Sequence, residues 1–531
     1  MTHEKRPTDA TVPPHPLFTI TLLKYLPFLF ALLVFPPVAS SQSLEAFEQR
    51  VTEHTLKNGW TFILVERPVA PVFAFMTRVN VGSVQEGAGV TGLAHMFEHM
   101  AFKGTPRLGT TDYAKEKVAL DELERAYLAY QEARLDPHSD KRHVEKLFKI
   151  FKEKQRAASK FVKKNEFGDI IEREGGVALN AFTSADVTGY FYALPSNKVE
   201  LFCYLESERF LHPVFRDFYE ERDVVMEERR MRTESRPIGR LLEQFTATSF
   251  MAHPYHHPVI GYASDIQSYT MTDALEFYKT YYVPTNMVTA IVGDIDPKTL
   301  IPLLEQYFGR IPLAPKSPPL RTVEPPSIAE KVITLQDPSQ PFYLEGYHKP
   351  AITHPDQPVF DAIDDILTNG RTSRFYRALV RDKKIAVAAG SYGAYPGEKY
   401  PHLWVAYAVP SRGVDNATIQ QAIREELDRL KTEDVTDEEL AKFRTRAKAN
   451  LIYSLKSNLG LAMSLTDYYT LFGDWRELFR YIKRFDGVTK ADIRRVAQQT
   501  FRASNRVVAQ IETVASPAPS TRQPQGRDTA K

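Results

Sequence analysis

A proline-rich stretch divides the chain of 531 residues, and the same order of predicted strands and helices recurs on both sides of it. Six prolines fall within residues 311–326, and proline at this density gives a stiff, extended linker. On each side, alternating and helically spaced apolar residues predict the order strand–strand–helix–strand–strand–helices–strand. A repeated order indicates an internal duplication. We therefore predict an α+β fold of two homologous domains, each a mostly antiparallel β-sheet packed against helices.

The domain boundaries follow from this order. The expected strands are 61–66, 71–81, 177–183, 187–194 and 287–292 in the first half, and 332–335, 342–347, 386–395, 403–409 and 506–511 in the second. The expected helices include 199–212, 220–234, 271–282, 358–367, 418–430, 436–457 and 491–501. We expect an N-terminal domain at 45–310, a linker at 311–327, a C-terminal domain at 328–514 and a disordered polar tail at 515–531.

A long charged segment, 113–165, is inserted in the first half. Apolar residues recur at spacings of three and four on both sides of a turn at 136–140, which predicts two antiparallel helices. Their outer faces are rich in Lys and Glu, as is typical of helix faces in solvent. Two roles stay open for this helical hairpin: part of a partner interface, or a limit on substrate entry.

The first 41 residues have the pattern of a signal peptide. Basic residues up to Lys24 precede an apolar run at 25–35, and small residues follow at 39–41. The run is shorter than the roughly 20 residues that span a bilayer. This pattern predicts export to the periplasm or secretion; an uncleaved N-terminal anchor is the alternative. No other segment could span a membrane, and the net charge of +2 gives no indication of nucleic-acid binding.

The residues that indicate chemistry lie in the stretch GLAHMFEHMAFKGT, 92–105. His95 and His99 are four residues apart, so on a helix both imidazoles project from one face and reach the same metal ion. Glu98 lies between them, in the inverted H-x-x-E-H order. Apolar residues surround the motif, which favours a buried helix. The alternative is a partly buried helix whose histidines hydrogen-bond to the backbone.

A third ligand is available in the stretch EERDVVMEERRMR, 220–232. Glu221 and Glu228 are seven residues apart, which is two turns along one helix face. The apolar residues between them indicate that part of this acidic helix is buried. A zinc site with two histidines needs one more anionic ligand and an open position for water.

These motifs together resemble the insulinase/pitrilysin family of zinc metallopeptidases, in particular its short bacterial and processing-peptidase-like members. The resemblance rests on HMFEHMAFKGT, LNAFTSADVTGYFYALP, ERDVVMEE, AHPYHHPVIG and YYVPTNMVTAIVGDIDP in this order. It implies a zinc endopeptidase that hydrolyses extended peptides or oligopeptides, with one Zn²⁺ per chain. It implies that His95, His99 and Glu228 are the zinc ligands. It further implies that Glu98 is the base that activates a zinc-bound water, and that Glu221 orients the site. Short members of the family have a shorter segment at 113–165, so the resemblance implies that the helical hairpin is an insertion that protrudes and leaves the motifs on both sides of it intact.

Substrate contact is expected at the edge of a strand. Residues 178–183 could present a strand edge to which an extended peptide adds, and Asn180, Ala181 and Phe182 are the candidates that line it. A core aromatic is the alternative for Phe182.

The second half departs from the family pattern at a substrate-binding pair. The family resemblance implies an Arg and a Tyr in the inactive homologous domain. Arg381 fits the Arg, but Val387, or Ala388 next to it, stands where the Tyr is expected. Tyr392 could substitute geometrically. The alternative function is therefore a non-catalytic or partner-dependent subunit, in which a paralogous partner supplies the pair. A homodimer, or a heterodimer with such a partner, is the expected assembly.

Overall fold

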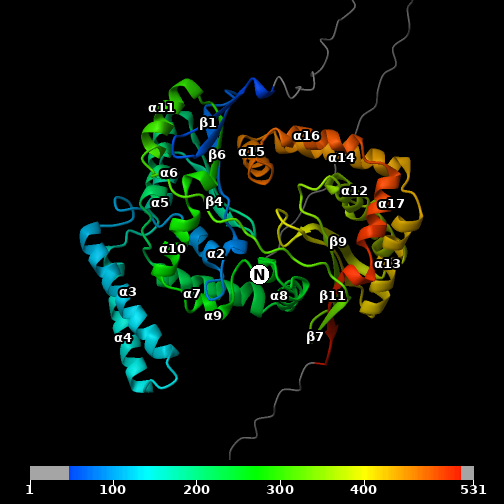
Figure 1. Cartoon of the computed structure of the whole chain (residues 1–531), viewed down its shortest axis with the longest axis horizontal. Helices are drawn as coiled ribbons and strands as arrows, with labels where there is room; N and C mark the ends of the chain where they lie inside the picture. The colour runs from blue at the N-terminus through cyan, green and yellow to red at the C-terminus, as the bar shows by residue number, and fades with distance from the viewer. Residues whose placement is uncertain (1–46, 516–531) are drawn as a thin grey trace, which may run out of the picture.

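The computed structural model of the chain describes residues 47–515 (Figure 1). The predicted signal peptide, 1–41, and all but the first residue of the predicted tail, 515–531, lie outside the described residues. Within the described part, no helix is both long and apolar enough to cross a membrane.

Two sheets with the same connectivity form the centres of the two halves. The first contains β1 (Val51–Thr55), β2 (Thr61–Glu66), β3 (Val72–Val79), β4 (Val177–Thr183), β5 (Thr188–Pro195) and β6 (Met287–Gly293). The second contains β7 (Lys331–Asp337), β8 (Phe342–Lys349), β9 (Ala386–Tyr395), β10 (His402–Pro410) and β11 (Arg506–Thr513). Their orders are β1-β2-β6-β3-β5-β4 and β7-β11-β8-β10-β9. Apart from β1, each strand has a counterpart, which confirms the prediction of two homologous α+β domains.

The pairing directions repeat as well. In each sheet the last strand lies between one parallel and one antiparallel neighbour: β6 is parallel to β2 and antiparallel to β3, and β11 is parallel to β7 and antiparallel to β8. The remaining pairs are antiparallel. As a result, β4 and β9 lie at corresponding edges of the two sheets.

One helix occupies the same point in the order of each half. The helix α2 (Leu93–Met100) follows β3, and α12 (Gln357–Thr368) follows β8 at the corresponding point. The others are α3 (Tyr113–Leu135), α4 (Lys141–Ala158), α5 (Glu166–Arg173), α6 (Val199–Leu211), α7 (Phe218–Arg229), α8 (Pro237–Ser249), α9 (Ala263–Ile266), α10 (Met271–Tyr281), α11 (Pro297–Phe308), α13 (Asn416–Thr432), α14 (Asp437–Ser454), α15 (Asn458–Phe472), α16 (Glu477–Asp486) and α17 (Lys490–Thr500). The predicted hairpin is formed by α3 and α4, which pack against each other along their length.

Several elements differ from the sequence-based expectation. The helix expected at 436–457 ends at Ser454, and a new helix, α15, begins after Ser457, whose hydroxyl accepts a hydrogen bond from the Gly460 N–H. The helices α5, α8, α9, α11, α15 and α16 and the short strand β1 were not predicted.

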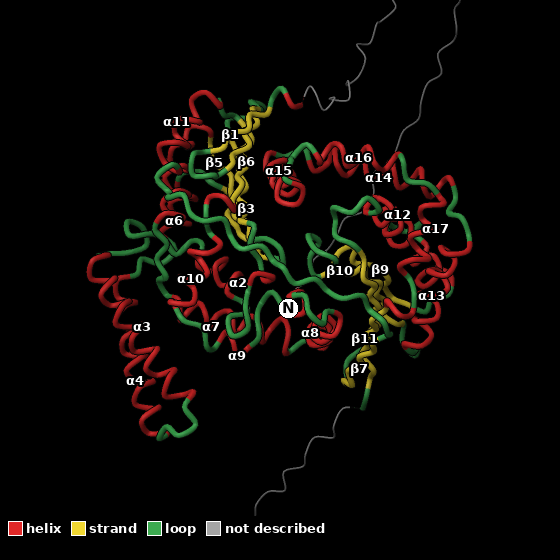
Figure 2. Tube along the Cα trace, in the orientation of Figure 1, coloured by secondary structure: helices red, strands yellow, loops and turns green. Residues whose placement is uncertain are grey.

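One helix of each half packs against the sheet of the other half. The helix α8, from the first half, packs against β11 and β7 of the second sheet, and α15, from the second half, packs against β3 and β6 of the first sheet. Figure 2 shows both helices between the two sheets. The Phe245 ring of α8 reaches the backbone of β8: a Cβ on Gly346 would lie 2.6 Å from the ring, so glycine is required there. The two halves are therefore bound together by their cores.

The proline-rich stretch between the halves contains no helix or strand from 312 to 330. It is nevertheless held in place, because the Glu324 carboxylate accepts hydrogen bonds from the backbone N–H groups of Met251, Ala252 and His253 at 2.7–2.9 Å.

Replacing the Phe245 ring should destabilise the second half, although Phe245 belongs to the first. Phe245 is fully buried, so we expect Phe245→Ala to lower the free energy of unfolding by about 3–5 kcal/mol. Urea unfolding measures this loss, and hydrogen exchange should increase in β8 and β11. On the same helix, Ile238 is 43% exposed, so Ile238→Ala should change stability by about 0.5 kcal/mol or less. Equal effects of the two substitutions would contradict the exchange of helices.

Candidate metal centre

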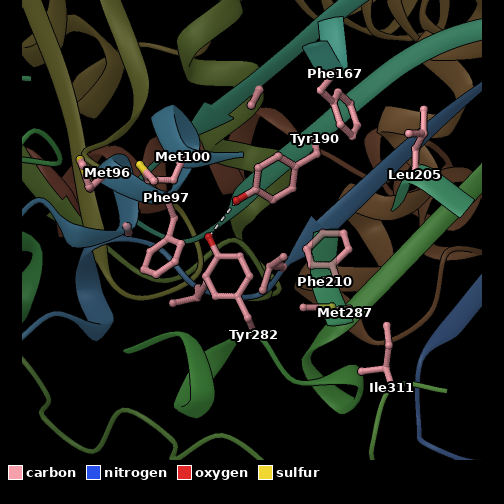
Figure 3. Close-up of a cluster of buried hydrophobic side chains, with 14 of the residues drawn as sticks. Met96, Phe97, Met100, Phe167, Tyr190, Leu205, Phe210, Tyr282, Met287 and Ile311 are labelled. Atoms are coloured by element: carbon pink, nitrogen blue, oxygen red, sulfur yellow. Dashed lines mark hydrogen bonds between the residues drawn. The ribbon is translucent and has the colours of Figure 1, made fainter. Parts of the chain in front are cut away.

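The helix α2 presents the three residues of the H-x-x-E-H motif on one face and buries the other. At 100° per residue, His95, Glu98 and His99 share one side, whereas Leu93, Phe97 and Met100 project from the opposite side. The Phe97 ring contacts the rings of Phe277 and Tyr282, with centroids 5.8 and 4.9 Å apart. Figure 3 shows Met96, Phe97 and Met100 beside the hydrogen-bonded pair Tyr190 and Tyr282. This apolar packing fixes the rotation of α2 about its axis.

The start of α2 is fixed by a buried carboxylate. Glu86 accepts hydrogen bonds from the backbone N–H groups of Gly92 and Ala94, at 2.8 and 2.7 Å, and so satisfies two of the free donors at the helix N-terminus. Gly92 has a φ of 94°, and a Cβ there would lie 2.6 Å from the Ile260 carbonyl oxygen. Glycine at this position therefore allows the turn into the metal-binding helix.

The structure brings His95, His99 and Glu228 together. Glu228 lies near the end of α7, far along the chain from α2. Its carboxylate oxygens are 3.8 Å from His95 Nε2 and 3.3 Å from His99 Nε2. One ligand atom from each of the three residues lies within 4.8 Å of the others, and this is the only such group among the described residues. The histidine-rich stretch 253–257 forms a turn instead, in which His253 Nδ1 accepts a hydrogen bond from the Tyr255 N–H.

The predicted orienting residue, Glu221, contacts the second imidazole. Its carboxylate is 3.4 Å from His99 Nδ1, on the opposite side of the ring from Glu228. The ammonium group of Lys103, just beyond α2, pairs with the same carboxylate. A carboxylate that holds the second nitrogen of a metal-ligating histidine fixes the tautomer and the orientation of the ring.

Sequence analysis missed two cations at this centre. Lys103 is one; the other is Arg232, in the π-helical segment η4 (Arg230–Glu234) after α7, whose Nη1 is 2.6 Å from Glu228 Oε1. The spacing of four residues between Glu228 and Arg232 was a usable signal for this pair. Arg232 is 71% exposed, so it balances the charge of Glu228 from the solvent side.

Burial and neighbouring charges shift the pKa values of the two histidines in opposite directions. Burial, together with the nearby His99, lowers the pKa of His95 to about 4, so His95 is neutral at physiological pH. Burial acts to lower the pKa of His99 too, but the hydrogen bond with Glu221 and the charge of Glu228 outweigh it and raise that pKa. Neutral imidazole is the form that binds metal ions.

These residues fit a zinc ion. Two imidazole nitrogens and one carboxylate oxygen are the protein donors of a catalytic zinc site, which leaves the fourth position open. His95 Nδ1 is buried and has no hydrogen-bond partner among the described residues, so the ring is not held there by the backbone interaction that the alternative reading requires. No disulfide competes for the site, because the single cysteine, Cys203, is buried elsewhere in the core.

Glu98 is placed between the metal ligands and the edge of the first sheet. It is half-buried, and burial raises the pKa of its carboxyl group more than its hydrogen bond to Thr183, the last residue of β4, lowers it. The Thr183 hydroxyl is also 3.4 Å from the Ala94 carbonyl oxygen, which ties β4 to α2. A carboxylate with a raised pKa next to an open metal position is suited to accept a proton from water.

The three substrate-binding candidates on β4 differ in orientation. The strand is at the sheet edge and pairs only with β5. Asn180 is exposed, and its side chain accepts a hydrogen bond from the Ala181 N–H at 2.8 Å. Ala181 is buried, whereas Phe182 is half-buried under the Arg78 guanidinium, whose carbon is 5.6 Å from the ring centroid. Phe182 thus packs as a core aromatic on the face that α15 covers.

The structure does not bring Arg381 to the metal ligands by any contact within residues 47–515. Arg381 lies at the end of η7 (Tyr376–Asp382) and pairs with its neighbour Asp382, at 2.5 and 2.9 Å. Val387, at the start of the edge strand β9, is 64% exposed. Tyr392, further along β9, is half-exposed and stacks on Tyr407.

The helix α12 shows what occupies the corresponding position in the second half. Asp361, Asp364 and Asp365 repeat the spacing of His95, Glu98 and His99. All three carboxylates are engaged by protein donors: Asp361 by the Tyr481 hydroxyl at 2.5 Å, Asp364 by the Trp404 indole at 2.8 Å, and Asp365 by Arg446 at 2.9 Å. The three aspartates therefore already have hydrogen-bond or ion-pair partners within the protein.

Comparisons with known proteins agree with this geometry. The family described as "Insulinase (Peptidase family M16)" matches residues 61–166, and the one described as "Peptidase M16 inactive domain" matches residues 268–447. The chain is 29% identical to the zinc protease PqqE of Helicobacter pylori, over 88% of this chain and 93% of that protein. It is 21% identical to an uncharacterized zinc protease, YmxG, of Bacillus subtilis, over 85% of this chain and 96% of that protein.

Solved structures show the same fold. A crystal structure of a protease from Helicobacter pylori, 27% identical, has a TM-score of 0.73 and covers 87% of this chain and 99% of its own. The periplasmic protease PqqL from Escherichia coli, 16% identical, has a TM-score of 0.64 and covers 88% of this chain and 48% of its own. With two matched family domains in the expected order, the chain belongs to the insulinase/pitrilysin family (peptidase family M16).

Proposed function

We propose that this protein is a zinc-dependent endopeptidase that hydrolyses extended peptides or oligopeptides. The observation that carries the proposal is the convergence of His95, His99 and Glu228 from two helices, with a ligand atom of each within 4.8 Å of the others. The names of the relatives, which are called zinc proteases, support the same reaction.

The side chains of the centre have two roles in the proposed reaction, metal binding and proton transfer. His95, His99 and Glu228 would hold one zinc ion, which when bound polarises the peptide carbonyl and acidifies a water molecule in the open position. Glu98 takes the proton from the attacking water on its carboxylate and returns it to the nitrogen of the leaving amine. The peptide bond is thus exchanged for a carboxyl group and an amine, and Glu98 is regenerated.

Glu221 and Lys103 hold the metal-binding side chains in this arrangement. Glu221 holds His99 Nδ1, so the other ring nitrogen points towards Glu228. Lys103 in turn pairs with Glu221, and this ion pair, together with the hydrogen bond from His99, lowers the pKa of Glu221 although burial alone would raise it. Glu221 therefore stays ionised and keeps the His99 ring oriented.

The edge of β4 is the proposed binding site for the peptide backbone. An extended peptide that pairs with this edge would run past Thr183 and so past Glu98, because Thr183 contacts both Glu98 and α2. The Ala181 N–H now donates to the Asn180 side chain, and a peptide carbonyl could replace that acceptor.

A partner-dependent peptidase subunit is the second candidate, and one observation favours it. The position where the resemblance implies a tyrosine is an exposed valine, Val387, and Arg381 is paired with Asp382. A homologous subunit could supply the missing pair. We also propose export of the protein, supported by the pattern of its first 41 residues.

Zinc content tests the metal centre. We expect the purified protein to bind about one zinc ion per chain, and His95→Ala to lose it, because the other two ligands do not complete a catalytic site. Glu221→Gln should bind zinc about 10–100-fold more weakly. His256→Ala, in the histidine-rich turn, should keep the zinc of the wild type. Metal analysis after dialysis measures all four; zinc-free, folded wild-type protein would refute the proposal.

Substitution of the base separates metal binding from chemistry. Glu98→Gln should keep the zinc stoichiometry but lower kcat for a fluorogenic peptide by about 10²–10⁴-fold, because the amide cannot accept the proton. The chelated wild type provides the inactive reference. Wild-type kcat in the Glu98→Gln protein would remove Glu98 from this role.

Dependence on a partner is measured by mixing. If the chain is self-sufficient, the purified protein should cleave a peptide library alone, and addition of a paralogous subunit that carries the Arg and Tyr pair should leave kcat unchanged. The partner-dependent candidate predicts the opposite: no cleavage alone, and cleavage on mixing. Because zinc binding is measured separately, a failure here leaves the metal centre intact.

A further inference from the structure

The helix α4 of the inserted hairpin, together with the short 3-10 turn η2 (Ser159–Phe161) that follows it, carries a row of mostly basic residues. Its members are spaced 4, 3, 4, 3 and 4 residues apart, so they form one stripe along the helix: Arg142, Lys146, Lys149, Glu153, Arg156 and Lys160. Five of the six are cations. At 1.5 Å per residue, the stripe is about 27 Å long. We call it the α4 stripe.

The α4 stripe points away from the body of the hairpin. At 100° per residue it lies opposite the side of α4 that carries Val144, Leu147, Phe151 and Gln155. Phe151 and Gln155 are buried, and Phe151 packs against Tyr127 of α3 and Tyr219 of α7. The inner side therefore anchors the helix, and the stripe faces solvent, since all six of its members are exposed.

The cations of the α4 stripe are unpaired. Among the described residues, no ion pair to an acidic side chain involves any of the five, whereas the neighbouring Lys152 and Lys154 pair with Asp223 and Glu122. The charge is also concentrated: α4 contains seven Lys and Arg against two Glu, in a chain whose net charge is only +2. An ordinary solvated helix face has both signs of charge interspersed.

The hairpin carries this charge away from the rest of the molecule. Figure 1 shows α3 and α4 extending from the first domain, with the turn that joins them at the far end. Leu135, the last residue of α3, is at that end and is 64% exposed. A basic helix face on a hairpin whose tip exposes an apolar residue is a combination that suits the surface of a lipid bilayer.

We propose that the α4 stripe docks the protein on an anionic phospholipid surface, with Leu135 at the level of the headgroups. A straight row of cations can lie along a plane of phosphates. Single-stranded nucleic acid fits less well, because the stripe offers no aromatic side chain on which bases could stack. The proposed export also brings the protein to membrane surfaces and away from nucleic acid. The peptidase proposal does not depend on this docking.

Vesicle binding tests the proposal with a matched pair of variants of the full chain. The stripe variant is Lys146→Gln, Lys149→Gln and Arg156→Gln. The control is Lys316→Gln, Arg321→Gln and Arg412→Gln, which removes the same charge from exposed sites outside the hairpin. Both keep the apolar run at 25–35, so any contribution of that run to lipid binding is common to them. Vesicles of phosphatidylcholine with and without 30% phosphatidylglycerol are the probes, in low and high salt.

We expect wild type and control to bind the anionic vesicles alike and to lose binding in high salt. Each cation near an anionic surface contributes roughly a factor of five, so the stripe variant should bind about 100-fold more weakly in low salt. Cleavage of a soluble peptide should be the same in all three proteins. Equal binding by stripe variant and control would overturn the proposal. Tighter wild-type binding to a DNA duplex or to poly-glutamate than to the anionic vesicles, at equal salt, would overturn the assignment to lipid.

Discussion

The packing of α2 against α7 is the contact on which the proposed function of this protein depends. It places two imidazoles and a carboxylate within 4.8 Å of one another, although they come from segments far apart in the chain. Buried polar groups of this kind are costly unless they have partners. Here burial keeps His95 neutral, Glu221 and Lys103 hold His99, and Arg232 balances Glu228. The centre is thus organised by protein side chains alone, in a form that a divalent cation can enter.

The second half shows how the same helix position behaves without a metal-binding role. The helix α12 keeps the spacing of the motif but has three aspartates, and Tyr481, Trp404 and Arg446 engage them. The two copies of one topology therefore differ in their donor types. The position in the fold permits a metal centre, and the residues placed there decide whether one can form. The second half contributes instead through α15, which covers the sheet next to the metal helix.

The sequence was sufficient for the residues whose chemistry depends on local spacing. His95, Glu98 and His99 share a face within about one helical turn, and Glu221 and Glu228 share a face over two turns of another helix. The assignment of Glu228 as a ligand and of Glu221 as the orienting residue came from the family resemblance. Residues that act through contacts between segments were missed: Lys103 and Thr183 acquire their roles only when α7 and β4 lie beside α2. The helices α8 and α15 were missed for a related reason, since each is buried against the sheet of the other half and neither sheet is adjacent to it in the sequence. Phe182 packs against the core because Arg78 and the helix α15, both distant from it in the sequence, cover its face of the sheet.

The central claim is that one zinc ion is held by residues of α2 and α7. Anomalous diffraction at the zinc edge, from crystals of the zinc-loaded protein, tests it most directly. The account predicts one peak, at about 2.0–2.2 Å from a nitrogen of His95, a nitrogen of His99 and an oxygen of Glu228. A zinc peak at other residues, such as the histidine-rich turn 253–257, or no peak in a loaded crystal, would contradict it.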